Sequence, residues 1–122
     1  MIKSVEEYDE LLAQDKPLII SFNAIWSPPC QRMNPIFEQL MEDEEFKDHI
    51  IMKRCDVDDR EDVQDKANNE AMPTYMFFHK GAMVEKVEGA NEEGMKELLR
   101  KAKKAGEEAG AGGGEGEAAA AE

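Results

Sequence analysis

Cysteine is scarce in this sequence of 122 residues, which contains only Cys30 and Cys55. Two cysteines far apart in the chain exclude the disulfide framework that staples small secreted domains. No apolar run approaches the roughly 18 residues of a membrane-spanning helix. Residues 1–7 also lack the apolar core of a signal peptide. We therefore expect a cytoplasmic protein with no membrane partner.

Basic residues are outnumbered, with 15 Lys and Arg against 28 Asp and Glu and a formal net charge of −13. Nucleic acid and anionic membranes bind basic faces, so this balance argues against both as partners. The cations of residues 100–104 suit the end of the last predicted helix better than a binding patch. His49 and His79 have no cysteine or acidic partners at ligand spacing, so we predict no metal and no cofactor.

Residues 105–122 contain only Ala, Gly and Glu. A segment of this composition has no side chains with which to build a core, and it is typical of a disordered acidic tail. The remaining residues, 1–104, have the usual size of one domain that can bury a core without disulfides. The sequence thus predicts one domain over 1–104 and a tail over 105–122.

Strand-like and helix-like patterns alternate along residues 1–104. Predicted strands cover 2–4, 18–24, 50–57, 75–78 and 83–87. Predicted helices cover a segment through Leu12 that opens on the capping box Ser4–Glu7, residues 28–46, a segment from 58 to about 68, and a last one holding Met95, Leu98 and Leu99. The order β-α-β-α-β-α-β-β-α predicts an α/β protein whose mixed sheet has helices on both faces, with the last two strands as a hairpin.

Trp26-Ser27-Pro28-Pro29-Cys30 lies at the turn from the second predicted strand to the second helix. Ser27 suits the N-cap and Pro28 suits the first helical position. Because Pro29 has no amide, the serine oxygen is expected to accept the Cys30 amide. This places a thiol in the first turn of a helix.

These segments also carry a family resemblance. The chain resembles thioredoxins in the kind, order and spacing of a series of residues. These are residues 22–30, Pro35, residues 56–58, residues 72–74, Phe77, Phe78, Lys80, Gly81 and residues 89–91. The similarity covers residues 1–103. It implies the thioredoxin fold, with a central mixed sheet of about five strands flanked by four helices.

The resemblance implies thiol–disulfide chemistry at this turn. Thioredoxins carry Trp-Cys-x-x-Cys here; the first cysteine attacks a substrate disulfide as a thiolate, and the second resolves the mixed disulfide. Ser27 stands at the first position, and a hydroxyl has no thiolate state. We match the family's buried aspartate, the base for the second cysteine, to Asn23, which cannot exchange a proton as a carboxylate does. Two-cysteine reduction of protein disulfides is therefore expected to be absent.

Three functions fit this pattern. The first is a divergent thioredoxin that binds protein thiols or disulfides and performs at most monothiol chemistry at Cys30. The second is a protein-disulfide reductase with a Cys-Pro-Pro-Cys turn into which Ser27 was introduced. The third is a non-catalytic interaction module, in which Cys30 is an inert packing residue. Cys55, inside a predicted strand, is expected to pack in the core and not to pair with Cys30.

The resemblance also implies a substrate-binding surface around Cys30. Pro73 matches a family proline that is cis, and Met72 offers its backbone to an extended chain. Residues Trp26, Pro28, Pro29, Met72, Pro73, Gly89 and Ala90 form the expected surface. Its expected partners are protein thiols or disulfides and a thioredoxin-reductase-like protein, with the chain itself a monomer or weak dimer.

Overall fold

The computed structural model describes residues 1–111, with side chains to residue 107. Its elements alternate as the sequence predicts. They are α1 (Val5–Leu12), β1 (Leu18–Asn23), α2 (Pro28–Glu42), α3 (Glu44–Lys47), β2 (Ile51–Asp56), α4 (Glu61–Lys66), β3 (Thr74–His79), β4 (Ala82–Glu88) and α5 (Glu92–Ala111). The predicted α/β architecture is confirmed.

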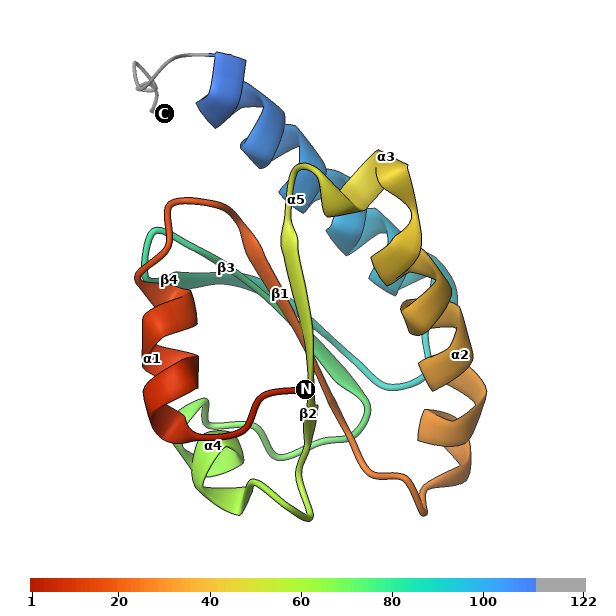
Figure 1. Ribbon diagram of the computed structural model, residues 1–122. Coiled ribbons are helices and arrows are strands. Elements are labelled where there is room, and N and C mark those ends of the chain that lie inside the picture. Colours follow the sequence, from red (N-terminus) through yellow and green to blue (C-terminus); the bar gives the residue numbers. More distant parts are fainter. Residues whose placement is uncertain (112–122) are drawn as a thin grey trace.

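One mixed sheet forms the middle layer, with strand order β2-β1-β3-β4. β1 is parallel to β2 and antiparallel to β3, and β3 forms the predicted antiparallel hairpin with β4. In Figure 1, α1 and α4 lie on one side of this sheet, and α2, α3 and α5 lie on the other. A central strand covered on both faces must be apolar on both, which explains the continuous run in β1.

The residues of β1 divide between the two cores by strict alternation. Ile19 packs with Phe37 of α2 and Met95 of α5, whereas Ile20 and Phe22 pack on the side of α1 and α4. Successive strand side chains point to opposite faces, so Ser21 and Asn23 share the face of Ile19. All six residues of β1 are buried. This alternation decides which polar residues meet α2.

The sheet has four strands among the described residues, not the predicted five. No strand forms at residues 2–4, although the Ile2 amide donates to the Arg54 carbonyl at 2.8 Å. The helix expected to run to residue 46 divides at Asp43, whose ψ of 123° is extended. The Asp43 side chain accepts the Glu45 amide at 2.8 Å and starts α3. A new N-cap therefore ends one helix and begins the next, which gives five helices in residues 1–111.

The last helix passes the predicted domain boundary. α5 continues to Ala111, so residues 105–111, which the sequence assigns to the tail, are helical. Ala105 packs against the core on the α2 side. A Cβ on Gly106 would lie 2.4 Å from the His49 carbonyl oxygen, so this glycine permits a close approach of the helix. The remainder of the predicted tail, 112–122, lies outside the described residues.

None of the helices in residues 1–111 is both long enough and apolar enough to cross a membrane.

Candidate functional site

The turn between β1 and α2 has the predicted helix start but not the predicted cap. Pro28 is the first helical residue, and the Ser27 carbonyl accepts the Gln31 amide at 2.8 Å. The Ser27 side chain, however, makes no capping hydrogen bond. Its φ of −83° differs from the −163° of Ser4, whose hydroxyl does cap α1 by accepting the Glu7 amide at 3.0 Å. Both backbones are extended, so the backbone region alone does not decide the cap, and the expected bond to the Cys30 amide does not form.

Cys30 lies entirely inside the fold, with an exposed fraction of 0%. Its Sγ accepts a hydrogen bond from the Ala24 amide at 3.3 Å. Met33 and Phe37, also buried, follow it along α2 at helical spacing. The thiol is thus held between the end of β1 and the first turn of α2, and it must be uncovered before it can react.

Two polar side chains of β1 are buried on the face toward α2. Asn23 Nδ2 donates to the Ser21 carbonyl at 3.2 Å and lies 3.4 Å from Ser21 Oγ, while Asn23 Oδ1 has no partner among the described residues. Asn23 alone was predicted for the buried-acid position, and Ser21 was missed. A serine in an otherwise apolar buried run was the available signal. Neither residue carries a carboxylate.

Tyr75 is the third buried polar residue here and was also missed. It is the cross-strand register partner of Ser21, and its ring centroid lies 5.5 Å from that of Phe37. Burial raises the pKa of Tyr75 to about 12, the charge of a Cys30 thiolate also raises it, and the Ser21 hydroxyl lowers it. Tyr75 therefore stays protonated at neutral pH, and a negative charge on Cys30 would make its ionisation still less favourable.

Trp26 stands at the outer side of the turn. Its side chain is 61% exposed, as is that of Ile25, and its indole Nε1 donates to Asp58 Oδ2 at 2.6 Å. Pro28 is exposed and Pro29 is half-buried. The turn thus presents apolar groups to solvent while its thiol faces inward.

Met72 and Pro73 lie beside this turn, because Thr74 pairs with Phe22 near the end of β1. The Met72–Pro73 peptide bond is cis, as the resemblance implied. The Gly89 amide donates to the Pro73 carbonyl at 2.8 Å, and Gly89 has a φ of +90°. Ala90 packs against the core on the α2 side. The structure therefore brings the 72–73 and 89–90 segments together.

Cys55 belongs to the other side of the sheet. It pairs in register with Phe22 and is packed in the core with Tyr8 and Val63. Burial, and then the carboxylates of Asp56 and Asp62, raise the pKa of its thiol to about 12, against a lowering by Arg60. Both cysteines are free. The core placement expected for Cys55 is confirmed, and its thiol is inert at neutral pH.

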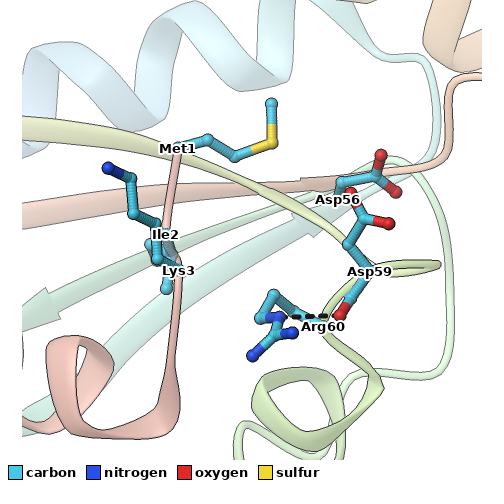
Figure 2. A pocket seen from close by; sticks show the side chains of 6 residues that line it. All are labelled: Met1, Ile2, Lys3, Asp56, Asp59 and Arg60. Atoms are coloured by element: carbon cyan, nitrogen blue, oxygen red, sulfur yellow. Dashed lines mark hydrogen bonds between the residues drawn. The ribbon is translucent and has the colours of Figure 1, made fainter.

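A surface pocket of about 340 Å³ lies at the end of β2. It is lined by Met1, Ile2, Lys3, Asp56, Asp59 and Arg60. Figure 2 shows the first three residues facing the other three, with Arg60 Nε donating to the Asp59 carbonyl at 2.6 Å. No thiol lines this pocket. In the part of the chain that the structure describes, no three His, Cys, Asp or Glu residues are grouped to hold a metal ion.

The mixed sheet, the turn that starts α2 with Cys30, and the cis proline beside that turn define a thioredoxin-fold protein. The thioredoxin family model matches residues 1–101. The chain is 36% identical over 105 residues to thioredoxin from Geodia cydonium, which covers 84% of this chain and 96% of that one. It is 37% identical over 87 residues to thioredoxin from Ictalurus punctatus, covering 71% and 80%.

A solved structure of Plasmodium falciparum thioredoxin superposes with a TM-score of 0.74 at 31% identity, covering 82% of this chain and 95% of that one. Malassezia sympodialis thioredoxin gives a TM-score of 0.77 at 27% identity, covering 84% and 88%. The chain belongs to the thioredoxin family, whose members are thiol–disulfide redox proteins.

Proposed function

We propose that this protein keeps the partner-binding surface of a thioredoxin but does not reduce disulfides by the two-cysteine reaction. One observation carries the proposal: Cys30 is the sole thiol of the turn, Ser27 stands at the first position, and Cys55 is buried on the other side of the sheet. What remains is monothiol chemistry at Cys30 or binding without chemistry.

The number of thiols at the turn limits which disulfide reactions are possible. In the two-cysteine reaction, one thiolate attacks a substrate disulfide and releases a substrate thiolate, and a second thiol then displaces the mixed disulfide. A lone Cys30 thiolate can form the mixed disulfide by the same attack. Its release then needs a thiol from outside the chain, such as glutathione. Because Cys30 is buried, the turn must open before the attack.

The exposed side chains of Ile25 and Trp26, beside the cis Met72–Pro73 bond, support binding of an extended segment from a protein thiol or disulfide. A thioredoxin-reductase-like protein is a further proposed partner. We propose a cytoplasmic monomer or weak dimer, consistent with the strong negative charge and the two free cysteines.

An insulin-reduction assay driven by dithiothreitol tests the main proposal. The unmodified protein should not exceed the rate with dithiothreitol alone. Ser27→Cys should restore some reduction, and Ser27→Cys combined with Ser21→Asp or Asn23→Asp should show which position supports a base. Cys55→Ala serves as the control and should change nothing. Reduction by the unmodified protein at the rate of Ser27→Cys would contradict the proposal.

The complete burial of Cys30 favours a second candidate, a non-catalytic interaction module. Incubation with oxidised glutathione followed by mass spectrometry separates the two. A mixed disulfide at Cys30, absent from a Cys30→Ser variant, supports monothiol chemistry. If the native protein gains no glutathione while a urea-unfolded sample does, Cys30 is an inert packing residue and the interaction module is the better description.

A further inference from the structure

Tyr75 combines complete burial with a hydroxyl that has no partner. Its exposed fraction is 0%, and its Oη makes no hydrogen bond with adequate geometry to any residue the structure describes. Phe37, on the buried face of α2 that also carries Cys30, packs against its ring. A phenylalanine would fill the same space without burying an unpaired hydroxyl. The hydroxyl therefore calls for an explanation beyond packing.

Ser21 and Asn23 of β1 lie on the same buried face of the sheet as Tyr75, because Tyr75 pairs with Ser21. Asn23 Nδ2 is directed to the Ser21 carbonyl and toward Ser21 Oγ, so one lone pair of that hydroxyl is already used. The Ser21 hydroxyl lowers the pKa of Tyr75, as a donor to the phenolate form does. Neither Tyr75 Oη nor Asn23 Oδ1 has a hydrogen-bond partner among the described residues.

We propose that Tyr75 is a positioning residue for Cys30, whose buried hydroxyl stabilises the Cys30 thiolate as a neutral donor from the interior of the fold. The inference rests on the proposed thiol function of Cys30. In the resting protein, Cys30 Sγ accepts only the Ala24 amide. When the sulfur becomes charged, the unpaired Tyr75 O–H turns toward it. A phenol that stays protonated can donate in this way but cannot serve as the base that a carboxylate provides.

β2 contributes two charged groups to this side of the sheet, and each is held by a neighbour, although Arg54 Nε is buried without a partner among the described residues. β2 contributes Arg54, which is paired with Glu38 of α2, and Asp56, whose Oδ1 accepts the Asp58 amide at 3.0 Å. α5 contributes the apolar Met95, Leu98 and Leu99. β1 contributes only the uncharged Ser21 and Asn23. Replacing Tyr75 by phenylalanine leaves all these groups in place, so a changed pH profile reports on the hydroxyl.

Alkylation of Cys30 by iodoacetamide as a function of pH tests the proposal in the full chain with Cys55→Ala. The thiolate forms the S–C bond and iodide leaves, so the rate follows the thiolate fraction. In Tyr75→Phe, we expect the midpoint of the profile to move to higher pH. Labelling should slow about fivefold to tenfold below the midpoint and stay unchanged above it. Tyr8→Phe, a buried tyrosine on the other side of the sheet, is the matched control.

Three outcomes would overturn the inference. A rate lowered equally at every pH would mean that Tyr75 affects only access to the thiol. An equal midpoint shift in Tyr8→Phe would show a general packing effect. A Cys30 that never reacts in the folded protein would remove the monothiol function and this inference together, whereas a reactive Cys30 with an unmoved midpoint removes only the inference.

A second measurement does not depend on the folding of Tyr75→Phe. In the unmodified chain, the ¹³Cζ resonance of Tyr75 should shift as Cys30 ionises. The same resonance should show no such step in Cys30→Ser, and Tyr8 should show none in either protein. A Tyr75 resonance that does not respond to Cys30 ionisation would contradict the proposed donor role.

Discussion

Trp26 and Asp58 are joined by a hydrogen bond of 2.6 Å from the indole Nε1 to the carboxylate Oδ2. This bond connects the turn before α2 to the loop after β2, which is 32 residues further along the chain. Because Trp26 is mostly exposed and makes this bond at the surface, its position depends on one polar contact more than on packing. The orientation of the apolar surface next to Cys30 therefore depends on Asp58.

Removing the Asp58 carboxylate should release Trp26 without unfolding the protein. In Asp58→Ala we expect lower fluorescence anisotropy of Trp26, the only tryptophan. Because the bond is exposed, the free energy of unfolding should fall by less than about 1 kcal/mol. Asp58→Asn, which keeps an acceptor oxygen, should retain most of the anisotropy, and Asp59→Ala should leave it unchanged. Equal anisotropy in Asp58→Ala and the unmodified protein would contradict this role.

The two N-cap serines should differ in their contribution to stability. Ser4 Oγ accepts the Glu7 amide at 3.0 Å, so Ser4→Ala should lower the free energy of unfolding by about 1 kcal/mol. Ser27 caps α2 in position only, without a side-chain hydrogen bond, so Ser27→Ala should change it by less than about 0.5 kcal/mol. Urea denaturation compares the two. A larger loss in Ser27→Ala would show that its hydroxyl does cap α2.

Two glycines of α5 give a second matched pair. A Cβ at residue 106 would meet the His49 backbone, so Gly106→Ala should destabilise the protein by about 1–3 kcal/mol despite the higher helix propensity of alanine. At Gly94 the Cβ would meet the movable Asn91 side chain, which now accepts the Gly94 amide. In Gly94→Ala the gain in helix propensity and the loss of this hydrogen bond should therefore nearly cancel. Thermal unfolding measures both. A more stable Gly106→Ala would mean that the end of α5 is not docked on His49.

His79 should make stability depend on pH. Burial first, and then Lys80, lower its pKa from the 6.5 of an exposed histidine, and Asp15 only partly opposes this. The unfolded chain then binds more protons, so this contribution is complete above pH 6.5 and is lost as the pH falls through the folded pKa. His79→Gln should show a smaller loss of unfolding free energy between about pH 7.5 and pH 5. His49→Gln is the control, and an unchanged pH dependence in His79→Gln would contradict the prediction.

Much of the fold could be predicted because its signals are local. The apolar run of β1, the capping box at Ser4 and the helical spacing from Cys30 to Phe37 each reflect contacts between near neighbours. The division of the second helix at Asp43 was missed. Asp43-Glu44-Glu45 is a good helix start, but it lies inside a pattern that also reads as a continuous helix. Local helix propensity is compatible with either one helix or two in this segment, so the packing of the folded chain determines where the first helix ends.

The candidate site could also be predicted only in part. Ser27 and Cys30 are visible in the sequence, as is the cis Pro73 through the resemblance. Ser21 was missed because a single serine does not reveal which residue will face it, and that depends on the register that sets it opposite Tyr75. The capping role expected of the Ser27 hydroxyl was wrong, because an extended serine before a helix need not turn its hydroxyl to the free amides.

The order and type of the residues were enough to predict an acidic α/β chain of the thioredoxin kind. They also show one thiol at the turn before a helix and a hydroxyl where a second thiol would be needed. Three features follow from the tertiary structure alone: Cys30 is enclosed, Cys55 lies on the other side of the sheet, and Tyr75 is buried opposite Ser21 with an unpaired hydroxyl. The two kinds of feature differ in how far apart along the chain the interacting residues are. Periodicity and capping act within a few residues, whereas burial and cross-strand partners arise from packing between segments distant in the chain.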